Sequence, residues 1–540
     1  MAKYRTPDPI NEPVKIYAPG SPERASLMTR LAAMQEEDLE IPLRIGGLDV
    51  TTGKLGQVRP PHNHRSVVAT FHQGGAAEVE KAVAAAQAAA PAWRKLAWQD
   101  RAAIFLKAAD LLAGPWRDTV NAATMIGQSK NCMQAEIDAA CELIDFLRFN
   151  ARYAQEIYEE QPRSSAGCWN RLEARALEGF VFAVTPFNFT AIAGNLSSAP
   201  AIMGNTVIWK PASTALLSGW YVMKLFEAAG LPPGVINMVT GGGAAIGTPA
   251  IAHPSLAGVH FTGSTRVFNG MWAEIGGNVG RYKTYPRIVG ETGGKDFIFA
   301  HPSADRQALA TALLRGAFEY QGQKCSAASR AYVPKSMWPD VKDRVAAMLE
   351  RVKVGPVDDF SNFVNAVIDE KSFDNISRYI DGAKKNSSCK IVAGGESDKS
   401  EGWFVQPTII ETSDPHAESM CEEIFGPVLT VYPYDDDKFE DTLDLCDRTS
   451  PYALTGAVFA QDRYAVELAS ERLVHAAGNF YINDKPSGAV VGQQPFGGSR
   501  ASGTNDKAGS KLNLLRWVSP RTIKETFVPA TDFSYPFLGE

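Results

Sequence analysis

Apolar residues recur at helical spacing through the first third of the chain. The Ala-rich stretch 74–93 predicts a helix, and a second helix is expected over 100–113, where a Gly-Pro pair ends the pattern. A stripe of Ile, Leu and Phe through 118–156 predicts one long helix. Residues 1 to about 45 are rich in proline and charge, and we expect them to form an extended arm that wraps the body.

Short apolar runs then alternate with helical patterns. The runs lie at 180–185, 206–210, 235–240 and 257–262, with helical patterns between them at 191–203, 214–229 and 244–252. Such alternation indicates a parallel sheet of βαβ units, in which a ligand lies beyond the carboxyl ends of the strands. Three segments follow the strand ends here: Pro186-Phe187-Asn188, Lys210-Pro211-Ala212-Ser213 and Gly263-Ser264.

A second α/β pattern begins at Gly290. It predicts a helix over 315–320 and strands over 330–333, 427–431 and 456–459. The tail 512–527 alternates apolar and polar residues, so we expect it to be a strand that pairs with a neighbour.

Charge and hydrophobicity indicate whether the chain binds nucleic acid or spans a membrane. The chain of 540 residues has 54 Lys and Arg against 60 Asp and Glu, a formal net charge of −6. A mildly acidic chain without a basic run is not expected to bind nucleic acid. No run of ~18 apolar residues is present, so we expect no membrane-spanning helix.

The N-terminus and the cysteines bear on the compartment. There is no apolar signal segment, and the acidic residues within 36–40 argue against a transit peptide. The seven cysteines show no spacing typical of a disulfide framework or a zinc site. We therefore expect no metal and a reducing compartment, the bacterial cytoplasm or alternatively the mitochondrial matrix.

The sequence indicates nucleotide binding only indirectly. The glycine-rich stretch 241–247 fails the G-x-G-x-x-G pattern because Ile246 holds the last position. Gly263-Ser264 follows a strand and opens a helix, so its backbone N–H groups could bind a pyrophosphate. The alternative is a plain β–α connection.

Three segments carry candidate chemistry. Cys325 follows a glycine break and is flanked by small residues, so its sulfur can be reached, and we expect backbone N–H donors to lower the pKa of the thiol. Asn188 could stabilise an oxyanion, and Glu291, on a glycine-rich bend, could activate water for a thioester. The alternatives are a core cysteine, a turn-forming asparagine and a charged surface turn.

Taken together, seven motifs resemble one family. In chain order they are PFNF, WKPA, FTGST, GETGGKD, GQKCSA, EEIFGPV and PFGGS. The set is similar to the NAD(P)-dependent aldehyde dehydrogenases over nearly the whole chain. Three longer stretches, NEPVKIYAPGSPER, QAEIDAACELIDFLRFNARYA and GNFYINDKPSGAVVGQQPFGGSRASGTNDKAGS, resemble the members that oxidise L-glutamate γ-semialdehyde to L-glutamate in proline catabolism.

The resemblance implies an α/β architecture in three parts. A Rossmann-type NAD-binding domain is expected at 1–160 and 183–290, and an α/β catalytic domain at 291–500. A β-flap at 161–182 and 505–540 is expected to pair with another subunit, which makes a homodimer or higher homo-oligomer the expected state.

The resemblance also implies roles for individual residues. The catalytic set is Cys325 as nucleophile, Asn188 in the oxyanion hole and Glu291 as the base for water. The cofactor set is Lys210, Ser213, Gly263, Ser264, Glu423 and Phe425. The substrate set is Glu142, Phe189, Ser326, Gly488, Ala489 and Phe496.

Two departures from the family pattern matter. Ser213 stands where many relatives have a glutamate that would repel a 2′-phosphate, so NADP is a weaker alternative to NAD. Ala489 stands where some relatives have serine, which leaves more of the carboxylate recognition to backbone N–H groups.

Three other functions are weighed beside this one. The chain could oxidise another aldehyde such as succinate semialdehyde, or it could be an inactive relative kept for binding. A bifunctional proline-oxidising enzyme is disfavoured, because a flavin-binding barrel of ~250 residues would not fit beside the family domain.

Overall fold

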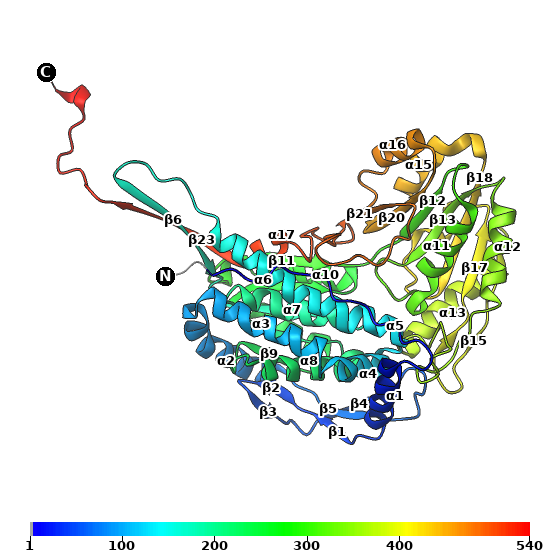
Figure 1. The fold of residues 1–540 in the computed structure, drawn as a ribbon, viewed down its shortest axis with the longest axis horizontal. Coiled ribbons are helices and arrows are strands. Elements are labelled where there is room, and N and C mark those ends of the chain that lie inside the picture. The colour runs from blue at the N-terminus through cyan, green and yellow to red at the C-terminus, as the bar shows by residue number, and fades with distance from the viewer. Residues whose placement is uncertain (1–3, 540) are drawn as a thin grey trace.

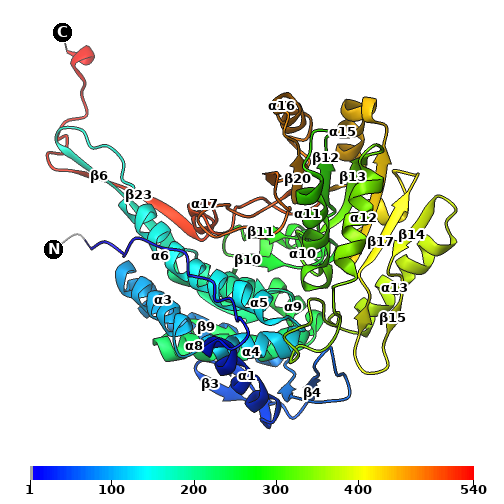
Figure 2. The same cartoon turned by 45° about the vertical axis from the view of Figure 1, so that its right-hand side comes forward.

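Two seven-stranded sheets form the cores of the two halves of the chain (Figures 1 and 2). The structure, a computed structural model, describes residues 4–539. Within that range none of the helices is long and apolar enough to cross a membrane.

The first sheet is parallel except at one edge. Its strand order is β11-β10-β7-β8-β9-β2-β3, in which β2 and β3 form an antiparallel hairpin. The strands are β2 (Leu43–Ile45), β3 (Leu48–Val50), β7 (Phe180–Val184), β8 (Thr206–Lys210), β9 (Ile236–Met238), β10 (Leu256–Thr262) and β11 (Arg287–Glu291). The chain order reverses between β7 and β10, and in open parallel sheets the crevice for a ligand opens at such a point.

Helices cover both faces of this sheet because alternate strand residues point to opposite sides. Val181 and Ala183 pack in one apolar cluster with α7 and α8, whereas Phe180 and Phe182 pack in another with α2, α9 and α10. The helices of this half are α2 (Ala76–Lys95), α3 (Trp98–Ala113), α4 (Arg117–Gln128), α7 (Thr190–Ile202), α8 (Leu216–Ala229), α9 (Gly243–Ala252) and α10 (Thr265–Gly277).

The second sheet lies on the other side of the crossing segment 292–295. Its order is β14-β17-β18-β13-β12-β20-β21, with β14 antiparallel at the edge. The strands are β12 (Asp296–Ala300), β13 (Ala328–Pro334), β14 (Cys389–Ala393), β17 (Thr408–Thr412), β18 (Val428–Tyr434), β20 (Thr455–Phe459) and β21 (Asn479–Ile482). The helices are α11 (Arg306–Phe318), α12 (Trp338–Leu349), α13 (Glu370–Lys385), α14 (Glu418–Cys421), α15 (Phe439–Arg448) and α16 (Arg463–Arg472).

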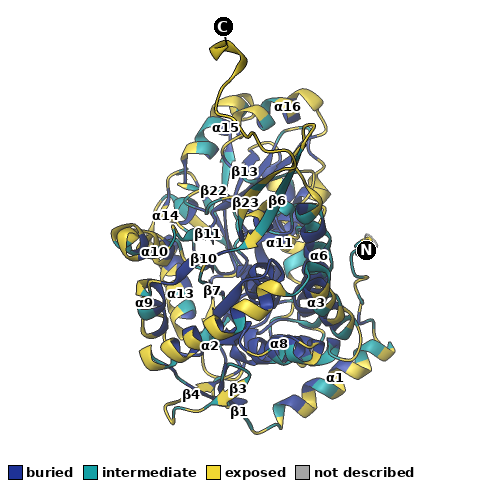
Figure 3. Ribbon diagram, turned by 90° about the vertical axis from the view of Figure 1, so that its left-hand side faces the viewer, coloured by how far each residue is buried: buried dark blue, intermediate teal, exposed yellow. Residues whose placement is uncertain are grey.

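A two-stranded ribbon projects from the first half. Strands β6 (Cys168–Ala176) and β23 (Val518–Thr526) pair antiparallel over their whole length. The ribbon and the tail that follows it extend away from the body, and Figure 3 shows the tail as exposed. The smaller sheets are β1 (Leu39–Ile41), β4 (Leu55–Val58) and β5 (Ala69–His72), then β15 (Ser397–Asp398) with β16 (Phe404–Val405), and β19 (Tyr452–Ala453) with β22 (Ser499–Arg500).

The strand predicted at 512–527 is correct only in its second part. The chain first forms helix α17 (Lys511–Leu515), where the side chain of Ser510 accepts a hydrogen bond from the backbone N–H of Leu512. Asn513 and Leu514 are buried, and α17 contacts α6 and α7. Tertiary packing therefore overrides the alternating pattern in this short segment.

The single helix predicted at 118–156 is also wrong. After α4 the chain breaks at residues 129–131, and it continues as α5 (Cys132–Ala135), a π-helical turn η1 (Glu136–Glu142) and α6 (Leu143–Glu159). Ser129 has φ of 55°, which ends the α-helical conformation, and the Asn131 side chain caps α5 by accepting from the N–H of Gln134. Apolar residues continue through the break, so the periodicity does not reveal it.

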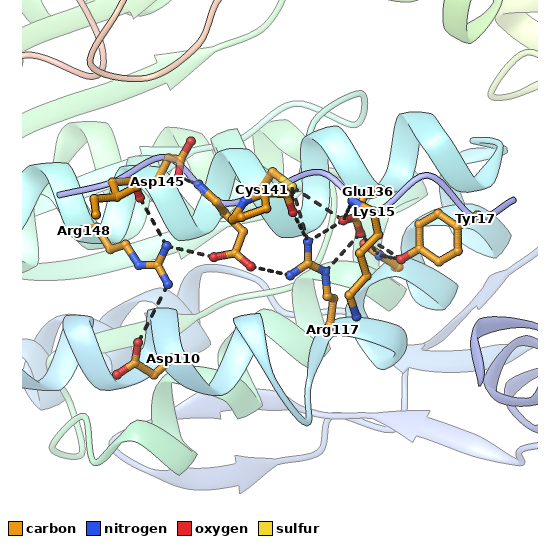
Figure 4. A network of polar contacts seen from close by, with 12 residues as sticks. Lys15, Tyr17, Asp110, Arg117, Glu136, Cys141, Asp145 and Arg148 are labelled. Atoms are coloured by element: carbon orange, nitrogen blue, oxygen red, sulfur yellow. Dashed lines mark hydrogen bonds and ion pairs between the residues drawn. The ribbon is translucent and has the colours of Figure 1, made fainter. Parts of the chain in front are cut away.

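The N-terminal arm is extended only before residue 22, where helix α1 (Pro22–Gln35) begins. The arm is tied to the helices by buried charges (Figure 4). The carboxylate of Glu136 accepts hydrogen bonds from Lys15 N at 2.8 Å and from Tyr17 Oη at 2.8 Å, and it pairs with Arg117. Glu12 bridges Arg117 and Arg148 at 2.6 and 2.8 Å.

Candidate active site

Two cavities meet at one cysteine. The larger cavity, of about 710 Å³, opens at the carboxyl ends of β7, β8 and β10, where the strand order reverses. The smaller, of about 80 Å³, lies behind it, between the π-helical turn η1, the start of α7 and the loop 488–496. Of the residues in the range 4–539, Cys325 alone lines both cavities.

The loop that carries Cys325 has an unusual backbone. Tyr320, Gln321 and Gly322 have φ of 51°, 55° and 64°, and left-handed conformations cost a residue with a side chain about 1 kcal/mol or more. At Gly322 a Cβ atom would lie 2.2 Å from the carbonyl oxygen of Gly426, so only glycine fits. The loop is held by the side chain of Gln321, which donates to Ser129 O at 2.9 Å and to Ala366 O at 2.8 Å.

Cys325 is half-buried as a residue, but the pKa of its thiol is not lowered as the sequence predicts. Burial raises the pKa of the thiol well above its ordinary value, and Glu291 raises it further, followed by Asp296. The cysteine precedes β13 instead of starting a helix, and its charged neighbours are carboxylates. A thiol whose pKa is raised must lose its proton to a base before it can attack a carbonyl.

Asn188 follows β7 and lines the larger cavity beside Cys325. Its amide nitrogen donates to the backbone oxygen of Gln323 at 3.0 Å, which ties it to the cysteine loop. A primary amide has two N–H donors, so the second remains for an oxygen atom in the cavity. This arrangement can stabilise a negatively charged oxygen.

Glu291 ends β11 and lines the smaller cavity together with Cys325. Burial raises the pKa of its carboxyl group to about 8, with Lys507 lowering it and Asp506 raising it. A carboxylate with a pKa this close to neutrality is a stronger base than an exposed one, which suits proton abstraction from water.

The residues predicted for a cofactor lie along the larger cavity with one exception. Lys210 at the end of β8, Gly263 and Ser264 before α10, and Glu423 and Phe425 line it. Ser213 lies in a 3₁₀ turn, η2 (Ser213–Ala215), and is not among the lining residues, although Ala212 is. Burial lowers the pKa of the Lys210 ammonium.

The carboxylate of Glu423 is fixed by the crossing segment. It accepts a hydrogen bond from the N–H of Gly294 at 2.9 Å, and a Cβ atom at Gly293 would lie 2.4 Å from its oxygen. Burial raises the pKa of Glu423 to about 7. Phe425 has φ of 58°, and its ring meets Phe187 edge to face at 5.8 Å.

All six residues predicted for the substrate line the smaller cavity: Glu142, Phe189, Ser326, Gly488, Ala489 and Phe496. Burial raises the pKa of Glu142 well above its ordinary value, and Asp138 adds to the effect. Gly488 has φ of 92°, a backbone conformation that glycine adopts without strain but a residue with a side chain rarely adopts.

The sequence reasoning missed charged residues around both cavities. Asp138 and Lys324 line the smaller cavity, and Glu274 of α10 lines the larger one. The four-residue spacing of Asp138 and Glu142 could have shown that they share a helix face. Lys324 directly precedes Cys325 in the GQKCSA motif, so its place beside the cysteine could also have been predicted, whereas no comparable signal points to Glu274.

Comparisons with known proteins identify the family of this chain. Residues 50–523 match the sequence profile of the aldehyde dehydrogenase family. The chain is 56% identical to the mitochondrial delta-1-pyrroline-5-carboxylate dehydrogenase of Dictyostelium discoideum, across 100% of this chain and 97% of that protein. It is 50% identical to the human mitochondrial enzyme of the same name, across 98% and 94%.

A solved structure is similar over the full length. The Delta-pyrroline-5-carboxylate dehydrogenase of Mycobacterium tuberculosis bound with NAD superposes with a TM-score of 0.97 at 54% identity, and each chain is covered to 100%. The α/β fold predicted from the motifs is thereby confirmed. On its sequence and on its fold, the chain belongs to the aldehyde dehydrogenase family.

Proposed function

We propose that the chain oxidises L-glutamate γ-semialdehyde to L-glutamate with NAD, the second step of proline catabolism. The observation that carries the proposal is the position of Cys325, which lines both a large cavity at the strand switch point and a small cavity that contains acidic side chains. The Dictyostelium discoideum and human relatives named for this activity are 56% and 50% identical to the chain.

The small cavity suits an aldehyde with an α-amino acid head. Glu142 lines this cavity, and a bound ammonium group would favour its ionised form, while the loop at Gly488 and Ala489 supplies backbone N–H groups for a carboxylate. Phe189 and Phe496 also line the cavity. Because the cyclic 1-pyrroline form has no free aldehyde, spontaneous ring opening must precede binding.

The large cavity fits a dinucleotide. Gly243, Gly247 and Gly270 line it, and a Cβ atom at each of these positions would meet open space, so the backbone is open to the cavity at these three positions. Gly263 and Ser264 precede α10, whose first N–H groups suit a pyrophosphate, and Lys210 suits ribose hydroxyls. When bound, the oxidised nicotinamide supplies the acceptor for a hydride.

The first half of the reaction uses the thiol. Glu291 and Cys325 line the same small cavity, so we propose Glu291 as the acceptor of the thiol proton. The thiolate then attacks the aldehyde carbon and forms a hemithioacetal on Cys325. Asn188 and the N–H of Cys325 stabilise the oxyanion until the hydride leaves and a thioester remains.

The second half of the reaction releases the acid. Glu291 first passes the proton of the thiol to solvent and then deprotonates a water molecule, which attacks the thioester carbon. The carbon–sulfur bond breaks, L-glutamate leaves and the thiol of Cys325 is restored. One aldehyde and one water are consumed for each acid and each reduced nicotinamide formed.

Replacing Asn188 with alanine should lower kcat ~10²–10³-fold, because one oxyanion donor is lost. The KM for NAD should change little, since the amide donates to the cysteine loop. Steady-state kinetics measure both. Asn362→Ala is the matched control, because Asn362 is also buried and donates its amide to a backbone oxygen, Pro356 O at 2.9 Å, but lines neither cavity. A wild-type kcat in Asn188→Ala would remove the residue from the oxyanion site.

The proposed activity is tested by kcat/KM for a panel of semialdehydes with NAD and with NADP, followed as absorbance of the reduced cofactor. We expect L-glutamate γ-semialdehyde with NAD to be the best pair. A higher kcat/KM for succinate semialdehyde would reassign the substrate, and a complete lack of turnover with every aldehyde would identify an inactive relative.

The assembly and the compartment follow from the same proposal. An exposed ribbon such as β6–β23 has unpaired edges that favour strand pairing with a second copy, so a homodimer or higher homo-oligomer is proposed. Light scattering on the purified chain measures its mass. The seven cysteines are free, which is compatible with a bacterial cytoplasm or a mitochondrial matrix.

A further inference from the structure

Lys130 is a buried lysine that contacts residues around the small cavity and in the cysteine loop. It lies in the break at residues 129–131, and its side chain is 1% exposed. The ammonium nitrogen is 2.5 Å from Asp138 Oδ2. It is also 4.3 Å from the centre of the Phe189 ring and 4.4 Å from that of Tyr320.

Each partner of this ammonium group belongs to the site. Phe189 lines the small cavity, and Tyr320 is the first left-handed residue of the loop that carries Cys325. Asp138 lines the same cavity and accepts hydrogen bonds from Thr190 N at 3.0 Å and Ala191 N at 2.9 Å, which open helix α7. One cation therefore contacts the substrate wall, the nucleophile loop and the carboxylate that orients α7.

Tyr320 contacts the ammonium group of Lys130 through its ring and not through its hydroxyl. Its hydroxyl is buried and has no hydrogen-bond partner among residues 4–539. Burial lowers the pKa of Lys130, and Asp138 opposes that shift. A cation removed from water is attracted to the face of an aromatic ring more strongly than one at the surface.

We propose that Lys130 is a positioning residue. Its ammonium group contacts the rings of Phe189 and Tyr320 together, and this clamp holds the Phe189 ring against the aliphatic chain of the substrate. The proposal rests on the proposed function, because it assigns the small cavity to the aldehyde. Lys130 does not line that cavity, so it acts on the substrate through Phe189 and Asp138.

The first test is Lys130→Met, which keeps the length of the side chain and removes the charge. Its KM for the semialdehyde should rise ~10-fold to 30-fold, the equivalent of losing a desolvated cation–π contact. The kcat should change by less than ~3-fold and the KM for NAD should not change, because the large cavity is untouched. Lys130→Arg, which keeps the charge, should restore most of the affinity.

The matched control is Lys342→Met. Lys342 also lies over an aromatic ring, Trp338 at 5.9 Å, and near a carboxylate, Glu411 at 3.6 Å, but it is far from both cavities. Its kinetics should be those of the wild type. A drop in kcat with an unchanged KM in Lys130→Met would indicate a smaller folded fraction and would overturn the proposal.

A double-mutant cycle shows whether the effect passes through the ring. In Phe189→Leu the clamp is already lost, so adding Lys130→Met should raise the KM by no more than ~2-fold further. Independent, multiplicative effects would contradict the proposal. Failure of the wild type to oxidise the semialdehyde would instead reject the proposed function, and the same KM comparison would be run with the aldehyde that it does oxidise.

Two variants at Tyr320 keep the proposal testable if Lys130→Met does not fold. Tyr320→Phe keeps the ring and removes only the unpaired hydroxyl, so its KM should equal that of the wild type. Tyr320→Leu removes the ring, and its KM should rise as in Lys130→Met. Equal KM values for the two variants would overturn the proposal.

Discussion

Replacing Cys325 with serine should lower kcat for aldehyde oxidation by at least ~10³-fold, because the nucleophile that forms the thioester is lost. Cys325 lines both cavities, so no neighbouring side chain can take its place between aldehyde and cofactor. The change of sulfur to oxygen preserves the shape of the loop, and the Kd for NAD, measured by calorimetry, should stay within ~3-fold of that of the wild type.

Cys132→Ser is the matched control. Cys132 is also half-buried, but it lies in α5 and lines neither cavity. Its kcat should be that of the wild type. If Cys325→Ser kept more than a tenth of the activity, or if Cys132→Ser lost it, the nucleophile would have to be sought elsewhere.

Replacing Glu291 with glutamine should slow thioester hydrolysis ~10²–10⁴-fold, because the base for water is lost while the volume of the side chain is kept. The proton of the thiol can still leave to solvent at high pH, so hydride transfer should slow less. Rapid mixing at pH 9 should therefore show a burst of one reduced cofactor per site, followed by slow turnover. Steady turnover at the wild-type rate without a burst would exclude Glu291 as this base.

The same carboxylate sets the expected pH dependence. Its pKa is raised to about 8, and only the deprotonated form accepts a proton, so hydrolysis in the wild type should rise with pH and level off above about 8. Asp506→Asn removes a charge that raises this pKa, which should move the midpoint to lower pH. Glu291→Gln should lose this dependence, and a profile that falls with pH in the wild type would contradict the assignment.

Much of the cofactor half could be predicted from short patterns. The runs that became β7, β8 and β10 are mostly apolar and are buried along almost their whole length, because both faces of a central parallel strand are covered by helices. Their carboxyl ends place Asn188, Lys210 and Gly263 at one edge, which the structure brings together in one cavity. The roles of these residues remain predictions from the family resemblance.

The features that could not be predicted, the helix break at residues 129–131 and the pKa of Cys325, depend on contacts between distant segments. The break at residues 129–131 is held by Gln321, which donates to Ser129 O from the cysteine loop nearly two hundred residues later in the chain. The pKa of Cys325 depends on four carboxylates from separate segments, which no local pattern around the cysteine contains. Local periodicity cannot report either feature, because both arise only when the two halves pack together.

The pairing of β6 with β23 has a consequence for the order of events during synthesis. The ribbon joins residues 344 positions apart, such as Arg175 and Ser519. During synthesis, β6 cannot pair until β23 has left the ribosome, which happens only when nearly the entire chain has been made. This part of the native topology should therefore form late and slowly. A premature stop codon shortly before position 518 would leave β6 as an open template for aggregation, even though every residue of both cavities had been translated.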